Sequence, residues 1–296
     1  MTGIVCLNKP GGITSFSAVS KVKGILGVKK AGHTGTLDPM ATGVLPVAAG
    51  GATRFIELLP SGRKEYIANF SLGLTTDTLD ITGEITGTYP VNSGPDDLKS
   101  VLALFRGEIE QIPPMYSAIL KDGVRLYEFA RKGIEIERTP RKVSIYSLEL
   151  SGFDPDKNEY EIKVECSAGT YIRTLISDIG DKLSCGAVMT KLCRTGSNGF
   201  LLSQSYTIEQ LEQLKKDDEI YKAVIPIEEI LSNFNSITVT SAQATRFVNG
   251  GGLLRDRLRE PLGEGLYRVY STENVFLGIG EITDSNNELK VKKLYL

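Results

Sequence analysis

The sequence predicts an α+β protein, with a mixed, largely antiparallel sheet flanked by helices and a small β-barrel at the C-terminal end. Two observations support this prediction. Segments with strand periodicity and segments with helix periodicity follow one another without a regular βαβ rhythm. The chain also has 296 residues, which is more than one hydrophobic core usually supports. We therefore expect a large domain over residues 1–232 and a small one over 233–296.

The first predicted helix follows a turn at residues 9–11, with Ser15 as its N-cap and Gly27 at its end. Its apolar residues recur at helical spacing and are Phe16, Val19, Val22, Ile25 and Leu26. From Tyr66 the pattern changes, and residues 66, 68, 70 and 72 share one face of an alternating segment. This alternation predicts a strand that begins near Tyr66.

The middle of the chain continues with a helix, two strands and another helix. Apolar spacing predicts a helix over residues 98–105 that Gly107 ends, and alternation predicts strands over 143–150 and 160–166. The second strand runs into residues 167–170 and a helix whose apolar positions are 172, 175, 176, 179 and 183. Arg173 therefore falls in the first turn of that helix.

The C-terminal segment predicts a small β-barrel behind a polar linker. A further helix is predicted over residues 207–215, and the composition turns polar over 233–236. Short strands are then predicted over 237–240, 266–270, 275–282 and 289–296, with one helix over 242–248.

Composition narrows the class of protein. Charged residues make up 24% of the chain and the formal net charge is -2, which argues against indiscriminate nucleic-acid binding and leaves that question to local patches. Four cysteines without CxxC spacing fit reduced thiols. Neither a signal-peptide pattern nor a membrane-length apolar segment is apparent. We expect a cytoplasmic protein that does not enter a membrane.

The segment over residues 32–44, GHTGTLDPMATGV, carries the most chemical information. His33 is the only histidine in the chain, so a catalytic triad or a zinc site built on several imidazoles would have to use this one residue or do without histidine. Asp38 lies in a loop that contains proline and several glycines. Such an Asp-Pro pair is most often only a turn when it stands alone. If the loop is reactive, Asp38 is the candidate group.

Four blocks in this order resemble the TruB family of bacterial tRNA pseudouridine-55 synthases. They are residues 7–15 (LNKPGGITS), residues 32–44, residues 64–66 (KEY) with 72–80 (LGLTTDTLD), and residues 169–175 (GTYIRTL). The C-terminal segment is similar to the PUA domain of RNA-modifying enzymes, through residues 246–251 and 276–280. The resemblance implies a pseudouridine synthase fold and conversion of uridine 55 in the tRNA T loop to pseudouridine.

The resemblance also implies roles for three catalytic residues. Asp38 is the expected nucleophile, Arg173 the cation that keeps it ionised, and Tyr66 the ring that stacks on the target base and assists proton removal. The sequence leaves open whether Asp38 attacks C1′ or first promotes departure of uracil to a glycal. His33 is expected to fill the space of the flipped nucleotide. Tyr171 and Leu192 match positions that line the nucleotide pocket.

A segment over residues 113–142 has seven basic and four acidic side chains, a local charge of +3, with three aromatic residues among them. A solvated helical hairpin is one interpretation of this composition. The other is an RNA-binding insertion, and the resemblance favours it because the family binds the tRNA T arm here. The expected RNA-binding cations are Lys64, Arg125, Arg131 and Arg141.

No cofactor is expected, because the reaction is an isomerisation and the glycine pairs lack nucleotide-binding spacing. No metal site is expected either, since Asp77 and Asp80 lack calcium-loop spacing. We expect a monomer that needs no protein partner. The alternatives are a tRNA-binding folding factor with secondary or lost catalysis, and a carboxylate-dependent glycosidase. The glycosidase lacks a clear second acidic residue and has no use for the basic insertion.

Overall fold

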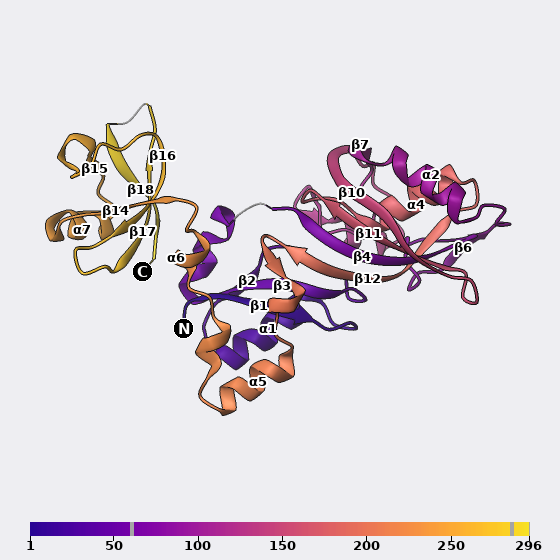
Figure 1. Cartoon of the computed structure of the whole chain (residues 1–296), viewed down its shortest axis with the longest axis horizontal. Helices are drawn as coiled ribbons and strands as arrows, with labels where there is room; N and C mark the ends of the chain where they lie inside the picture. The colour runs from indigo at the N-terminus through magenta and orange to yellow at the C-terminus, as the bar shows by residue number, and fades with distance from the viewer. Residues whose placement is uncertain (60–61, 285–286, 296) are drawn as a thin grey trace.

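The computed structural model describes residues 1–59, 62–284 and 287–295. Most of the chain is built on one nine-stranded sheet with the order β1-β3-β12-β4-β11-β10-β7, in which β2 also pairs with β3 and β13 with β12 (Figure 1). Its strands are β1 (Gly3–Lys9), β2 (Ala31–His33), β3 (Thr42–Ala49), β4 (Lys64–Leu72), β7 (Gly107–Gln111), β10 (Arg141–Asp154), β11 (Glu159–Cys166), β12 (Ala187–Ser197) and β13 (Phe200–Leu201). Only β3 and β12 run parallel, so the predicted mixed, largely antiparallel sheet is confirmed.

Strand β4 lies in the middle of this sheet, between β12 and β11. The predicted alternation is correct, because Tyr66, Ala68, Phe70 and Leu72 are all buried while the residues between them are half-buried. The strands predicted over 143–150 and 160–166 are confirmed as parts of β10 and β11.

Strands β1 and β3 have no polar face, which explains why alternation does not reveal them. Val5 and Leu7 of β1 enter the main core, whereas Ile4 and Cys6 enter a second core on the opposite side. Since both faces of the sheet are covered here, apolar residues follow one another directly along each strand.

Helices cover the sheet in two groups. Near the N-terminal strands, α1 packs beside α5, and at the other end α2 and α4 pack against β10 and β12 (Figure 1). The helices are α1 (Ser15–Leu26), α2 (Pro95–Leu104), α3 (Leu126–Ala130), α4 (Ile172–Lys182), α5 (Ile208–Lys216), α6 (Ile227–Ile230) and α7 (Ser241–Val248), with 3-10 turns η1 (Gly50–Leu58), η2 (Leu202–Gln204), η3 (Ile220–Ala223) and η4 (Arg255–Arg257). The predicted positions of α1, α2, α4, α5 and α7 agree with these bounds within a few residues.

The start of α1 differs from the prediction in two ways. Thr14, not Ser15, is the N-cap, because its side chain accepts a hydrogen bond from the Ser17 backbone. Ser15 is buried and hydrogen-bonds both backbone groups of Leu37 instead. Phe16 is 79% exposed and does not belong to the buried face of the helix.

The C-terminal part forms its own five-stranded sheet, with the order β14-β16-β17-β18-β15, which curls into a half-barrel beside α7 (Figure 1). Its strands are β14 (Asn235–Thr238), β15 (Leu253–Leu254), β16 (Gly265–Tyr270), β17 (Phe276–Ile282) and β18 (Glu288–Leu294). The predicted linker over 233–236 is wrong in its second half, because β14 begins at Asn235 and pairs with β16. The end of the last predicted strand, Leu296, lies outside the described residues.

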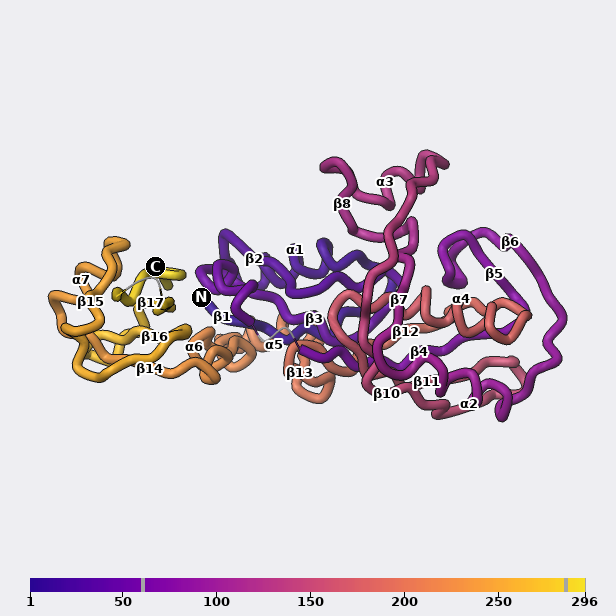
Figure 2. Tube along the Cα trace, turned by 90° about the horizontal axis from the view of Figure 1, so that it is seen from above, coloured from indigo at the N-terminus to yellow at the C-terminus, as the bar shows by residue number. Residues whose placement is uncertain are grey.

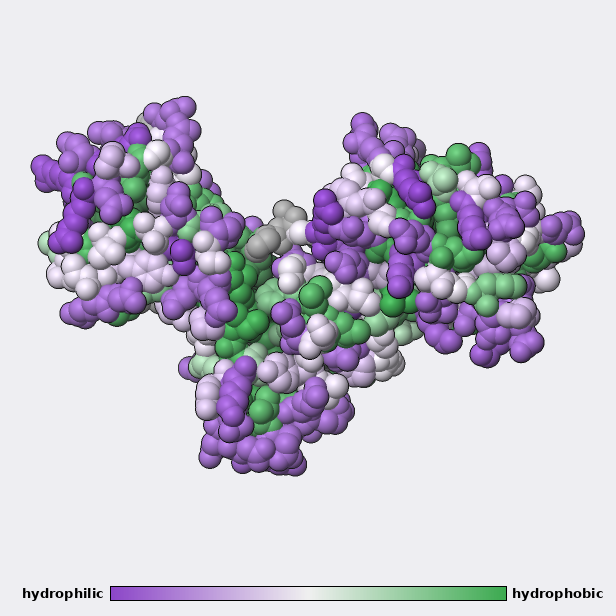
Figure 3. All heavy atoms as spheres, in the orientation of Figure 1, coloured by the Kyte–Doolittle hydropathy of each residue, from purple (hydrophilic) through white to green (hydrophobic). Residues whose placement is uncertain are grey.

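The half-barrel packs directly on the larger sheet. Phe276 of β17 shares the second core with Phe55 of η1, with ring centroids 6.1 Å apart, and Lys293 forms an ion pair of 2.8 Å with Glu57. The space-filling view shows hydrophobic residues on the surface where the half-barrel meets the larger domain (Figure 3). The domain boundary at residue 232 stays a prediction, since one core contains side chains from both sides of it.

Two small hairpins project from the main sheet. One is formed by β5 (Leu74–Thr76) and β6 (Ile85–Thr88), and the other by β8 (Leu120–Lys121) and β9 (Val124–Arg125). The β8–β9 hairpin and the short α3 stand out from the body between β7 and β10 (Figure 2). In residues 1–59, 62–284 and 287–295, no helix has the length and apolar character to span a bilayer.

Candidate active site

The loop that contains Asp38 connects β2 to β3 and is held in place by four hydrogen bonds to Leu37 and Pro39. Ser15 Oγ donates to the Leu37 carbonyl at 2.9 Å and accepts from the Leu37 backbone N–H at 2.8 Å. The Gly12 backbone N–H donates to the Pro39 carbonyl at 2.8 Å, and Lys9 Nζ donates to the same oxygen at 3.3 Å. The residues on both sides of Asp38 are therefore fixed to β1 and α1.

Asp38 forms an ion pair with Arg173 in the first turn of α4. Arg173 Nε lies 3.0 Å from Asp38 Oδ2, and the side chains are 6% and 34% exposed, respectively. Each of the other two guanidinium nitrogens also has a partner, because Nη1 donates to the Thr78 carbonyl and Nη2 to the Tyr116 carbonyl, each at 2.9 Å. The buried guanidinium is thus rigid, while the carboxylate keeps an accessible edge.

Opposing influences set the proton affinity of Asp38. Burial raises the pKa of Asp38 above its ordinary value, and the charge and hydrogen bond of Arg173 counteract that rise. The negative charge of Asp80 acts in the same direction as burial. Removing Arg173 would therefore favour the protonated, non-nucleophilic acid.

Asp80 is a buried acidic residue whose part in this site the sequence did not indicate. Its Oδ1 accepts from Thr78 Oγ1 and from the Thr82 backbone N–H, each at 3.0 Å, and its Oδ2 lies 3.7 Å from Arg173 Nη1. Arg173 therefore lies between two carboxylates. In the sequence Asp80 is distinguished only by its position in the TDTLD segment, and its spacing from Asp77 bears only on the question of a metal site.

Tyr66 is buried on β4, in register with Arg194 of β12. Burial raises the pKa of the Tyr66 phenol to about 12, and the charge of Arg194 and a hydrogen bond from it act in the opposite direction. Arg194 is fully buried and hydrogen-bonds carbonyls of the Asp38 segment. The sequence did not indicate a role for Arg194, since a single arginine in a strand normally faces solvent.

His33 and Lys64 lie beside the same loop. His33 ends β2 and is half-buried, and its Nδ1 has no hydrogen-bond partner among the described residues. Burial lowers the pKa of His33, and the charges of Arg194 and Arg125 lower it further. The pKa of half-buried Lys64 is also lowered, by burial and then by Arg194.

Tyr171 and Leu192 complete the buried surroundings of the site. Tyr171 precedes α4, and its backbone N–H donates to Gln111 Oε1 at 3.1 Å while its carbonyl accepts from Gln111 Nε2 at 3.3 Å. Burial raises the pKa of its phenol, and the Asp38 charge adds to that rise. Leu192 is buried in the main core.

The predicted cations of the insertion are exposed but not all close to Asp38. Arg125 and Arg141 are near enough for their charges to act on His33 and Tyr171, respectively. Arg131 lies over the Tyr127 ring of its own segment, 5.2 Å from the centroid. At its base the insertion is tied to the site, because the Tyr116 carbonyl accepts a hydrogen bond from Arg173 Nη2 and the Tyr116 hydroxyl donates to Asp77 Oδ2 at 3.3 Å.

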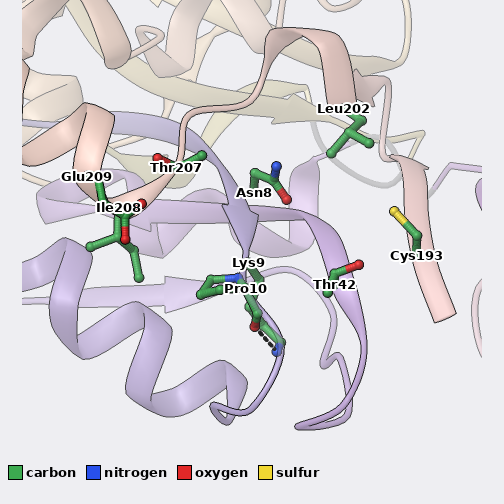
Figure 4. A pocket seen from close by; sticks show the side chains of 9 residues that line it. All are labelled: Asn8, Lys9, Pro10, Thr42, Cys193, Leu202, Thr207, Ile208 and Glu209. Atoms are coloured by element: carbon green, nitrogen blue, oxygen red, sulfur yellow. Dashed lines mark hydrogen bonds between the residues drawn. The ribbon is translucent and has the colours of Figure 1, made fainter. Parts of the chain in front are cut away.

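A cleft of about 320 Å³ lies between the end of β1 and the start of α5 (Figure 4). Asn8, Lys9, Pro10, Thr42, Cys193, Leu202, Thr207, Ile208 and Glu209 line it. Neither Asp38, Tyr66 nor Arg173 is among them, so the cleft and the ion-paired centre are separate features. In the described ranges no three His, Cys, Asp or Glu side chains come together as a metal site.

Comparison with known proteins gives matches along the chain. The family model "TruB family pseudouridylate synthase (N terminal domain)" matches residues 23–172. Two C-terminal models follow, "tRNA pseudouridylate synthase B C-terminal domain" at residues 173–232 and "Pseudouridine synthase II TruB, C-terminal" at 236–294.

Similar proteins extend over the same length. The tRNA pseudouridine synthase B of Clostridium kluyveri is 42% identical over 297 residues, with all of both chains covered. That of Pseudomonas syringae pv. syringae is also 42% identical, covering 96% of this chain and 92% of its own. Among solved structures, one of a Cbf5-Nop10-Gar1 complex matches with a TM-score of 0.72 at 27% identity, covering 99% of this chain and 85% of that one.

Proposed function

Because the chain belongs to the TruB family of pseudouridylate synthases, we propose that it isomerises the uridine at position 55 in the T loop of tRNA, with Asp38 as the nucleophile. The activity itself, formation of pseudouridine in tRNA by an isomerase, follows from the full-length relatives. The position in the tRNA and the residue roles belong to the proposal.

The reaction breaks the N1–C1′ bond of uridine, turns the uracil and joins C5 to C1′. The proton lost from C5 is balanced by one gained at N1, so the atoms and electrons of the substrate are conserved. The protein must supply a nucleophile, a surface that holds the detached base, and a path for that proton.

The ion pair between Asp38 and Arg173 is the observation that carries the proposal. A nucleophilic carboxylate must be ionised, accessible and oriented, and Asp38 is 34% exposed and 3.0 Å from a buried guanidinium. The contacts of Leu37 and Pro39 with α1 and β1 support the orientation. These features are compatible both with attack on C1′ and with a glycal route.

Tyr66 is proposed to stack on the target base and to assist removal of the C5 proton. Its ring is held in the centre of the sheet, and the charge of Arg194 opposes the rise in the pKa of the phenol that burial causes. His33 would fill the space that the flipped nucleotide leaves in the T loop, and Tyr171 and Leu192 would line the pocket that receives this nucleotide. The unpartnered Nδ1 of His33 supports this, because buried polar atoms are normally hydrogen-bonded.

The protruding insertion, residues 113–142, is proposed to contact the T arm of the tRNA. Exposed Arg125, Arg131 and Arg141 can each neutralise a phosphate, and half-buried Lys64 can do so closer to the reacting nucleotide. We propose that one copy of the chain acts in the cytoplasm, on free tRNA and without a protein partner.

The test is to map pseudouridine in an unmodified tRNA transcript after incubation with the purified protein alone. Product at position 55 with the wild type, and none with Asp38→Asn, would support the proposal. Asp38→Asn keeps the shape of the side chain but removes its charge. A transcript with cytidine at position 55 is the matched control and should gain no product elsewhere.

Three outcomes would contradict parts of the proposal. Product with Asp38→Asn would remove Asp38 from its role. Product at another uridine would overturn the assigned position. Tight tRNA binding without product from the wild type would favour the folding-factor alternative.

A further inference from the structure

Arg194 is a buried cation that the reaction as described does not use. It lies on β12 with no exposed surface, and it is the largest fully buried side chain in the described residues. Transfer of a charged side chain from water into a protein interior is costly unless hydrogen bonds compensate for the lost hydration. The hydrogen bonds of Arg194 should therefore compensate for the cost of burying its charge.

The hydrogen bonds of Arg194 join the two ends of the Asp38 segment. Nε donates to the Val44 carbonyl at 2.7 Å, and Nη2 donates to the Gly35 carbonyl at 3.0 Å. Nη1 lies 3.5 Å from the Thr36 carbonyl, a weaker contact. Gly35 and Thr36 precede Asp38 and Val44 follows it, so one planar group spans the base of the loop.

The same guanidinium lies beside Tyr66. The two residues are paired across β12 and β4, and the charge of Arg194 lowers the pKa of the Tyr66 phenol against the effect of burial. A rigid fork with several fixed donors can hold three groups in one geometry, which the single ammonium of lysine cannot reproduce.

We propose that Arg194 is a positioning residue that holds the Asp38 loop and the Tyr66 hydroxyl in one fixed geometry for the isomerisation. The inference rests on the proposed roles of Asp38 and Tyr66. Arg194 touches neither the substrate nor the Asp38 carboxylate in this account. It acts through the backbone of residues 35, 36 and 44 and through the Tyr66 phenol.

The experiment compares Arg194→Met and Arg194→Lys with the wild type on an unmodified tRNA transcript. Single-turnover rates, tRNA dissociation constants and unfolding temperatures are measured for each. Arg268→Met is the matched control, because Arg268 on β16 of the half-barrel also donates to two backbone carbonyls, those of Phe234 and Glu228. Asp38→Asn is included in the same series.

Arg194→Met should lower the single-turnover rate by about 100-fold or more, because small displacements of reacting groups have effects of that order. The tRNA dissociation constant should change less than about threefold, since phosphate contacts of the insertion remain. Arg194→Lys should recover part of the lost rate, and Arg268→Met should keep the wild-type rate. Equal losses of rate and affinity would overturn the proposal, as would an equal rate loss in Arg268→Met.

A double-mutant cycle with Tyr66→Phe tests the contact with the phenol. If Arg194 acts partly through that hydroxyl, Arg194→Lys should slow the Tyr66→Phe enzyme less than it slows the wild type. The same fold-loss in both backgrounds would show that Arg194 does not act through Tyr66. If Arg194→Met fails to fold, the lysine variant decides, and a wild-type rate in it would overturn the inference.

The two proposals fail in different ways. An active Asp38→Asn variant would contradict the proposed function. An inactive Asp38→Asn variant beside Arg194 variants of wild-type rate would contradict only the positioning role. A wild type that forms no product would overturn both.

Discussion

Asp38 illustrates how single contacts determine the chemistry that a residue can perform. Burial favours its protonated form, and Arg173 at 3.0 Å favours the ionised one. Below its pKa the carboxyl is protonated and cannot attack, so the rate should fall as the pH falls through that pKa. The position of the acid limb therefore reports the balance between burial and the guanidinium.

Arg173→Gln should move the acid limb of the pH–rate profile to higher pH and lower the plateau rate by about 100-fold. The direction follows because Arg173 lowers the pKa of Asp38, and glutamine removes that charge. Single-turnover rates across a pH series measure both effects. Arg268→Gln in the half-barrel is the control and should leave the limb in place. A limb that stays at the wild-type pH in Arg173→Gln would show that the titrating group is not Asp38.

Tyr66→Phe separates two functions of one side chain. The ring remains, so tRNA affinity should stay within about threefold, whereas loss of the hydroxyl should reduce turnover by about 100-fold, the range for one general base. Filter binding and single-turnover rates give the two quantities. Tyr267→Phe is a control, because its hydroxyl donates to the Gly263 carbonyl in the half-barrel. Turnover near that of the wild type in Tyr66→Phe would exclude the proton-transfer role.

Among the elements, the junction of β3 with β12 imposes the strictest requirement. Gly43 has a φ of 100°, and a Cβ there would collide with the Arg194 carbonyl oxygen. Gly12 also has a positive φ of 82°, but no atom lies within 4 Å of its added Cβ. An alanine at either position would be strained by the positive φ, but only an alanine at position 43 would also collide with a neighbouring strand.

Gly43→Ala should lower the free energy of unfolding by more than Gly12→Ala, which should cost about 1–2 kcal/mol from strain alone. Gly43→Ala adds steric displacement of β12 and should also slow catalysis, because Arg194 would move with the strand. Urea unfolding and single-turnover rates measure the two effects. Equal losses of stability in the two variants would contradict the predicted crowding.

The insertion between β7 and β10 should contribute affinity rather than chemistry. Arg131→Ala should weaken tRNA binding and reduce the slope of log affinity against log salt by about 1, with the rate at saturation unchanged. Lys99→Ala on α2 is the control, since Lys99 pairs with Asp96 on the same exposed helix. An unchanged salt slope in Arg131→Ala would mean that this residue does not contact a phosphate.

At the scale of the element, prediction from sequence succeeded where one face is polar. Strand β4 and helices α1, α2 and α4 each bury one side, so their periods are visible. Strands β1 and β3 bury both sides, and the protruding hairpin β8–β9 is too short for a period to appear.

The whole molecule has a core that crosses the boundary between the half-barrel and the main sheet. Phe276, Phe55 and Tyr295 form an aromatic group there, with centroids 5.2–6.3 Å apart. Shared burial of this kind links the stability of the two parts. The half-barrel should therefore not unfold independently at a much lower temperature.

Phe276→Ala should destabilise the molecule by about 3–5 kcal/mol and split one calorimetric transition into two, because the shared core loses its central ring. Leu289→Ala, which removes a buried side chain from the half-barrel's own core, should lower stability without separating the transitions. Two transitions already present in the wild type would contradict the proposed coupling.

Ordered sequence blocks that include Asp38, Tyr66 and Arg173 were sufficient to assign the family, and residue periodicity was sufficient to locate most helices and strands that bury one side. Motif blocks consist of residues adjacent in the sequence, and one-sided helices and strands show a regular spacing of apolar residues, so both can be recognised without the tertiary structure. The tertiary structure alone decided that Asp80 faces Arg173 and that Arg194 spans the Asp38 loop, 150 residues away from Val44 in sequence. Such contacts depend on strand order and register, which bring distant backbone groups together and which no local pattern encodes.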